Sequence, residues 1–144
     1  MRLALKIGIG VVAVFGLIQA VQLDRTNPAV SGDVDAAPEV KNTLRRACYD
    51  CHSNETTWPW YSRVAPSSWL VHYDVYDGRK TLNFSEWASQ APEHRAKLRE
   101  EIGESVAEGD MPPWYYTPLH SNARLSDADR RLLQTWAASG DGNR

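Results

Sequence analysis

The chain has few of the residues that build small metal and redox centres. Its 144 residues contain two cysteines, Cys48 and Cys51, so no other use of a thiol competes with this pair. A structural zinc site takes four ligands at short spacings, and no second Cys/His pair supplies the other two. Basic residues form no patch and the net charge is −2, which argues against a nucleic-acid-binding protein. One domain is expected at this length.

What the chain does contain is the run Cys48-Tyr49-Asp50-Cys51-His52, with the C-x-x-C-H spacing of a haem attachment site. Each thiol can add to one vinyl group of haem, and a helical turn presents both thiols to the ring. His52 then lies under the ring centre, where its imidazole can bind the iron. The alternative is a redox disulfide, but a thioredoxin-type motif needs no histidine and belongs in an α/β pattern that this sequence lacks.

The first 25 residues form a segment of their own. Arg2 and Lys6 precede an uncharged run from Ile7 to Leu23, as in a secretory signal or a membrane anchor. The run is as short as a spanning helix can be, and no clean A-x-A cleavage site follows it. We therefore expect an uncleaved single-pass anchor, with a cleaved signal or a buried core helix as alternatives. The positive residues at its start place everything after residue 25 on the outer side of the membrane.

The rest of the chain divides into a linker and a helical domain. Residues 26–37 are rich in Pro, Gly, Asp and small residues and are expected to be a linker. The domain covers residues 38–140, and residues 141–144 are a frayed tail. The apolar spacing predicts helices at 38–49, from Ser67 to a stop at Gly78, at 92–108 with Gly109 as a left-handed cap, and from Ser126 to Gly140. The turn and capping residues that support these helices are Pro38, Pro92, Ser126 and Asp129.

Met111 is the candidate for the second iron ligand, and Met1 is the one other methionine. Met111 lies between the predicted helix cap at Gly109 and the pair Pro112-Pro113. The two prolines stiffen the backbone beside Met111. A thioether is a weak ligand and needs such support, and the chain from His52 is long enough to reach the far face of a haem. The alternative is a methionine that fills a gap in the core. The competing ligands are His72, His94 and His120.

Residues 38–138 resemble the haem-binding domain family, a small bacterial cytochrome-c-like module. The resemblance implies an all-α fold of cytochrome-c-like helices around one covalently attached haem c, ligated by His52 and Met111. It also implies attachment outside the cytoplasm, which agrees with an exported chain. Arg79 and Lys80 could pair with a haem propionate, the alternative being a solvated turn. The matching motifs are Cys48-x-x-Cys51-His52-Ser53, Trp58-Pro59-Trp60-Tyr61, Ala65-Pro66, Gly78-Arg79, Leu82-Asn83-Phe84, Met111-Pro112-Pro113 and the helix that ends at Trp136.

Two classes of function follow. The first is an electron carrier at the periplasmic face of the inner membrane, with both axial positions filled and unidentified redox proteins as partners. The second is a haem enzyme or gas sensor, peroxidase-like, whose distal ligand is displaced. An enzyme needs a distal base or proton donor, and no His-Arg pair stands at a suitable spacing, so we expect a carrier with no catalytic residues. A structural haem module of a larger membrane complex is a third alternative.

Overall fold

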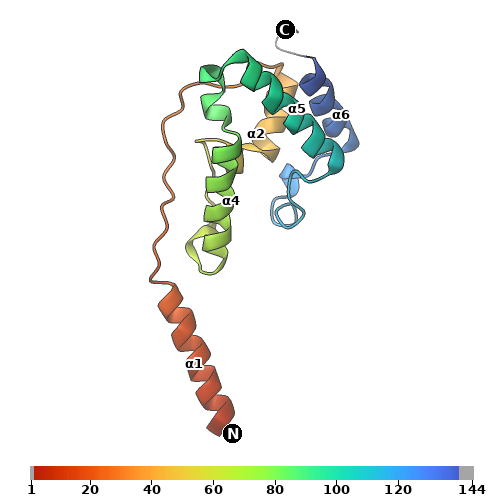
Figure 1. Ribbon diagram of the computed structural model, residues 1–144. Helices are drawn as coiled ribbons and strands as arrows, with labels where there is room; N and C mark the ends of the chain where they lie inside the picture. Colours follow the sequence, from red (N-terminus) through yellow and green to blue (C-terminus); the bar gives the residue numbers. More distant parts are fainter. Residues whose placement is uncertain (1, 140–144) are drawn as a thin grey trace.

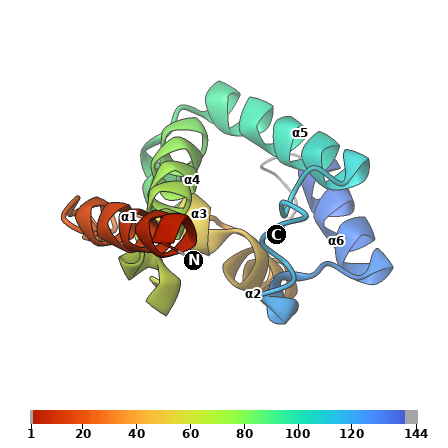
Figure 2. The ribbon, with the colours of Figure 1, turned by 90° about the horizontal axis from the view of Figure 1, so that it is seen from below.

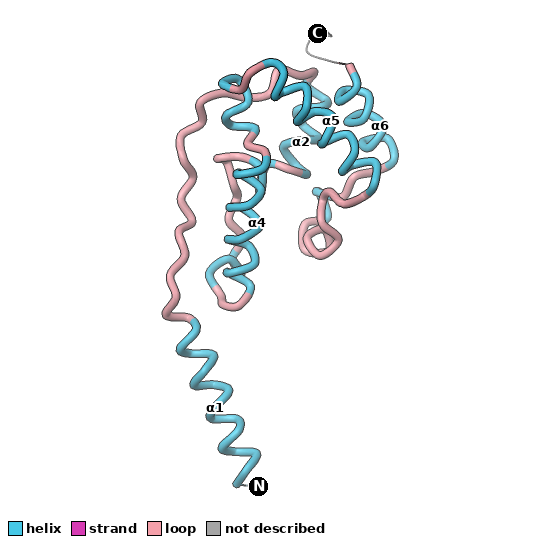
Figure 3. Tube along the Cα trace, in the orientation of Figure 1, coloured by secondary structure: helices cyan, strands magenta, loops and turns pink. Residues whose placement is uncertain are grey.

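The computed structural model describes residues 2–139, and within that range the chain is helical with no strand (Figure 3). The predicted all-α class is therefore confirmed. The predicted tail at 141–144 and the stop at Gly140 lie outside the described residues. The described elements are α1 (Arg2–Ile18), α2 (Pro38–Ala47), α3 (Tyr49–His52), α4 (Ser67–Thr81), α5 (Pro92–Glu108), α6 (Asp127–Ala138) and three short 3₁₀ turns, Trp60–Arg63, Phe84–Ser89 and Ser121–Ala123.

Helix α1 projects from the domain and is joined to it by an extended segment (Figure 1). It forms from the apolar run in which the sequence predicted a membrane helix. None of its described side chains is buried. Among the residues that the structure describes, no helix combines the length and the apolar character needed to cross a bilayer. The structure thus gives no support to the predicted membrane helix.

Residues 26–37, predicted as a linker, have no helix, but they are packed along the domain. The backbone N–H groups of Ser31 and Gly32 both donate to the Ser85 carbonyl, each at 3.0 Å. Val34 is fully buried in the main core, although its neighbours in the sequence are polar or small. The Asn54 side chain also donates to the Ala29 carbonyl at 2.8 Å, so these contacts fix the segment to the domain without regular structure.

The core lies where α2, α5 and α6 meet. Seen from below, α3 and α4 lie on one side and α6 on the other, with α2 between them (Figure 2). Leu44 of α2 and Leu133 of α6 are both fully buried, and burying each such side chain stabilises the fold by about 1.5–3 kcal/mol. The predicted ends are confirmed at two helices: Gly109 caps α5 at φ 84°, and Ser126 forms a capping box with Asp129 at α6.

The predicted helix over 38–49 is broken in two. Helix α2 ends at Ala47, and Cys48 has a non-helical backbone with φ −125° before α3 begins at Tyr49. The short α3 therefore carries Cys51 and His52 in a direction of its own. This break turns the attachment motif away from the axis of α2 and toward α4, on which α3 packs.

The predicted stop at Gly78 is wrong, because α4 continues through it to Thr81. The glycine is required by packing and not by the end of a helix. A Cβ added at Gly78 would lie 2.7 Å from the carbonyl oxygen of Cys51 and 3.3 Å from its Cβ. Only a residue without a side chain lets α4 approach the attachment motif this closely.

Candidate haem-binding site

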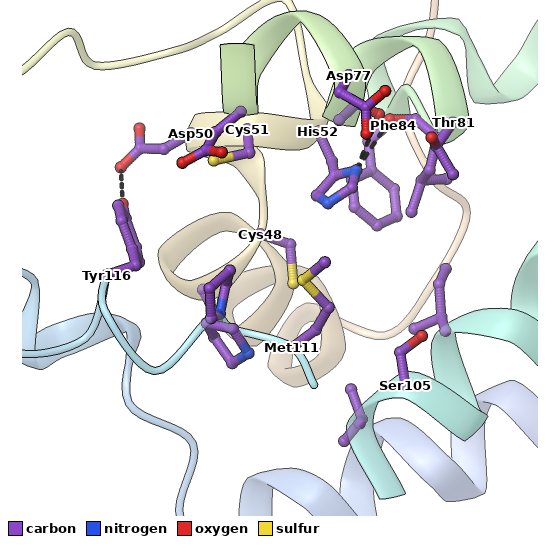
Figure 4. Close-up of a pocket in the computed structure, with 18 of the residues that line it drawn as sticks. Cys48, Asp50, Cys51, His52, Asp77, Thr81, Phe84, Ser105, Met111 and Tyr116 are labelled. Carbon is purple, nitrogen blue, oxygen red and sulfur yellow. Dashed lines mark hydrogen bonds between the residues drawn. The ribbon is translucent and has the colours of Figure 1, made fainter. Parts of the chain in front are cut away.

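A cavity of about 370 Å³ opens beside the attachment motif (Figure 4). Cavities that hold small molecules and cofactors range from about 300 to 1,000 Å³. Five parts of the chain line it: the end of α2 with α3, the second half of α4, the segment that follows α4, one face of α5 and the loop that follows α5. The apolar part of the lining comes from Ala47, Leu82, Phe84, Leu98, Ile102, Val106, Pro112 and Pro113.

His52 lines the cavity with its imidazole held by backbone carbonyls. Its Nδ1 lies 3.0 Å from the Gly78 oxygen and 3.2 Å from the Leu82 oxygen. Both partners are acceptors, so Nδ1 carries the proton and donates, which leaves Nε2 as the free lone pair. Such a second contact fixes the tautomer and orientation of metal-binding histidines. Burial lowers the pKa of His52, which favours the neutral form that can bind iron.

The thiols of Cys48 and Cys51 also line the cavity, and both are free. Burial raises the pKa of each thiol to about 12. In redox C-x-x-C motifs the reactive thiol has a lowered pKa, because the thiolate is the nucleophile. The structure therefore offers two protonated thiols on one side of a cavity, and not an activated dithiol.

Met111 reaches the same cavity from the loop after α5 (Figure 4). The loop leaves α5 through Gly109, and the N–H groups of Asp110 and Met111 donate to the Ser105 carbonyl at 3.0 Å and 3.3 Å. The Met111 side chain is 37% exposed, so it is not a buried filler of the core. Of the four histidines, all within the described residues, only His52 lines this cavity.

Arg79 does not reach the cavity, contrary to the suggested pairing with a propionate. Its guanidinium donates to the Ser53 carbonyl at 2.7 Å, to Asn27 Oδ1 at 2.8 Å and to Thr56 Oγ1 at 2.9 Å. These bonds join α4 to the segment before α2 and to the chain after α3. The alternative of a solvated turn holds in part: Lys80 is exposed, but both residues lie in the last turn of α4 and not in a separate turn. Among the described residues that line the cavity, none is Lys or Arg.

The sequence did not single out several residues that the structure brings to this site. Asp50, inside the attachment motif, accepts a hydrogen bond from the Tyr116 hydroxyl at 2.7 Å. Asp74, Asp77 and Glu101 contribute carboxylates to the lining, and Tyr73 and Tyr115 contribute hydroxyls. The pair Tyr115-Tyr116, one residue beyond Met111-Pro112-Pro113, was the available signal, but spacing alone does not say which partner each ring meets.

The residues of the cavity fit a covalently bound haem: two thiols, one oriented imidazole, one thioether and an apolar wall. In the described residues, no three His, Cys, Asp or Glu side chains come together as a metal site. Fold and site together define an all-helical haem-binding protein. The chain belongs to the haem-binding domain family, whose model matches residues 13–139. Neither the curated proteins nor the solved structures gave a match to the chain.

Proposed function

We propose that this protein is a c-type cytochrome-like electron carrier. One haem is attached through Cys48 and Cys51, and its iron is ligated by His52 and Met111. The observation that carries the proposal is that one cavity collects all four side chains, although Met111 comes from a different part of the chain. Haem bound in this way supplies an iron that cycles between two oxidation states.

The remaining residues of the site would tune that iron without reacting with it. The carbonyls of Gly78 and Leu82 hold the His52 proton on Nδ1 and make the ligand more basic. The apolar wall keeps water from the ring, and a thioether in place of a second imidazole raises the reduction potential. Several carboxylates in the lining, including Asp74 and Asp77, favour the more positively charged oxidised state.

The alternative function is a peroxidase-like enzyme or a gas sensor. Such a protein needs an open distal position and a base or proton donor above it. The cavity places its one histidine on the attachment side and contains no Arg or Lys among its described lining residues. Met111, in the position proposed here, would block the distal side. These features favour the carrier.

Binding of carbon monoxide (CO) to the reduced protein distinguishes the electron carrier from the enzyme or gas sensor. We expect the reduced wild-type protein to bind CO slowly and incompletely, because the Met111 sulfur has to leave before CO can enter. The measurement is the absorption spectrum of the reduced protein over time after CO is added. Rapid and complete CO binding would contradict the carrier and favour the enzyme or sensor.

We propose that a redox partner docks on the loop that follows α5, which carries Met111. Trp114 is 83% exposed and its ring meets that of Tyr115 edge-on, beside the partly exposed Met111. Aromatic side chains are enriched at the centres of protein–protein interfaces. Together with the carboxylates Asp74 and Asp77, this loop favours a partner with an apolar patch surrounded by basic residues.

The proposed location is outside the cytoplasm, with residues 1–25 as the targeting or membrane-association segment. The support is the positive start at Arg2 and Lys6, followed by an apolar helix whose described side chains are all exposed to some degree. The resemblance to haem-binding domains implies that haem is attached to the C-x-x-C-H motif outside the cytoplasm, which agrees with this location. This proposal covers both an anchor and a cleaved signal.

Localisation can be tested with a reporter enzyme that is active only in the periplasm, fused after Arg144. We expect activity from the full-length fusion, because the positive residues at the start keep the N-terminus inside. The matched control lacks residues 2–23 and should be inactive. Reporter activity in the membrane fraction indicates an anchor, and activity in the soluble periplasmic fraction indicates a cleaved signal. An inactive full-length fusion would contradict export.

A further inference from the structure

The loop between α5 and α6, residues 109–126, contains Met111 and has one strong contact with the attachment motif. The Tyr116 hydroxyl donates to Asp50 Oδ2 at 2.7 Å, and the other carboxylate oxygen of Asp50 accepts from the Thr57 N–H at 2.9 Å. Asp50 lies between Cys48 and Cys51. The residue that lies between the two attachment cysteines in the sequence therefore also binds the loop of the proposed distal ligand.

A second set of contacts supports the Tyr116 ring. The imidazole of His120 stacks on that ring with centroids 4.0 Å apart and planes 9° apart. His120 Nε2 lies 2.6 Å from the Tyr61 hydroxyl, which belongs to the 3₁₀ turn before α4. The ring of Tyr116 is thus held from its face and from its hydroxyl, and it is only partly exposed.

Near Met111 itself the restraints are weaker. The Met111 N–H bond to Ser105 is long, at 3.3 Å, and the side chain is 37% exposed. On the other side of the loop, Tyr115 donates to Asp74 at 3.3 Å in an exposed contact. Of these contacts, the one between Tyr116 and Asp50 is the shortest and the less exposed, and its acceptor is a carboxylate. Hydrogen bonds to charged groups are the stronger class.

We propose that Tyr116 is a positioning residue for Met111: its bond to Asp50 holds the loop against the attachment motif and so keeps the sulfur at the iron. This inference rests on the proposed ligation by Met111. A weak thioether ligand dissociates when its loop moves, so loss of the bond increases the time that the distal position is open. The motif that attaches the haem would then also determine how tightly the opposite ligand is held.

The test uses the haem-loaded protein and the variant Tyr116→Phe, which retains the ring and its stacking on His120 and removes only the hydroxyl. A lost hydrogen bond to a charged group costs about 1.5–3 kcal/mol, equivalent to about a 10- to 100-fold change in an equilibrium constant. We expect CO to bind the reduced variant at least about tenfold faster than it binds wild type. Amide exchange over residues 111–119, measured on the same protein, should accelerate while α2 and α6 stay protected.

Tyr76→Phe is the matched control, because it removes a hydroxyl from an exposed tyrosine of α4 that does not line the cavity. Its CO rate should remain within about twofold of wild type. Asp50→Ala should reproduce the effect of Tyr116→Phe, and the double variant should be no faster than either single one, since both remove the same bond. A CO rate in Tyr116→Phe equal to that in Tyr76→Phe would overturn the proposal.

A further variant, Met111→Ala, separates the failure of this inference from the failure of the proposed function. If Met111→Ala binds CO rapidly while Tyr116→Phe behaves as wild type, Met111 is the ligand and Tyr116 does not position it. If Met111→Ala has no effect on CO binding, the ligation is wrong, and the role of Tyr116 falls with it. Rapid CO binding by both variants, with a slow control, supports both proposals.

Discussion

Replacing Met111 with Ala is expected to open the distal side of the haem and lower its reduction potential. The variant should still carry covalent haem, because attachment depends on Cys48 and Cys51 and not on Met111. Loss of the thioether removes the ligand that favours the reduced iron. The expected fall is a substantial part of the range of about 0.8 V over which axial ligands set haem potentials. Redox titration and CO binding to the reduced variant measure both effects.

Met111→His is the companion variant, since it replaces one iron ligand by another. It should close the site to CO again but keep the potential below that of wild type, because a second imidazole stabilises the oxidised iron. An unchanged spectrum and potential in Met111→Ala would contradict the ligation. If His72→Ala or His120→Ala then altered both quantities, that histidine would be the ligand. The structure makes this outcome unexpected, because neither residue lines the cavity.

Much of the fold could be predicted because its signals are local in the sequence. Pro38 and Pro92 each begin a helix, where the missing N–H group has no cost. Gly109 ends α5 because its φ of 84° is open to glycine, and Ser126 with Asp129 caps α6 within a single turn. In each case the residues that decide the structure lie within four positions of one another, so spacing alone is informative.

The errors come from contacts that join distant parts of the chain. Gly78 has the appearance of a helix stop, yet its role depends on the approach of Cys51, which only the packed fold reveals. Arg79 was a candidate for a propionate, but its guanidinium satisfies the Ser53 carbonyl, 26 positions away. Composition also gave no sign that Val34, in a polar segment, would lie in the core.

In the candidate site, too, the local features could be predicted from the sequence and the contacts between distant residues could not. The C-x-x-C-H spacing and the Pro-Pro pair beside Met111 could be found in the sequence, because covalent and steric requirements fix them locally. That these two motifs border one cavity is a property of the packing of α3, α4 and α5. The bond between Asp50 and Tyr116 spans 66 positions, and no pattern in the sequence connects the two residues.

Changing both Cys48 and Cys51 to Ser is expected to have the second large effect: all haem should become removable. Each thioether forms when an S–H adds across a vinyl group, and a serine hydroxyl is too weak a nucleophile to replace it. His52 remains oriented by Gly78 and Leu82, so the double variant should still bind haem, but only non-covalently. Acid-acetone extraction, or denaturing electrophoresis with detection of haem, should show no haem left on the chain.

The two single variants, Cys48→Ser and Cys51→Ser, are the controls for this experiment. Each retains one thiol at the cavity and should keep haem covalently bound through one thioether, with a shifted spectrum because one vinyl group is left free. Mass spectrometry should therefore find one haem on wild type and on each single variant, and none on the double variant. Haem that stays covalently bound after both thiols are removed would mean that another residue forms the bond and that the attachment motif has been misread.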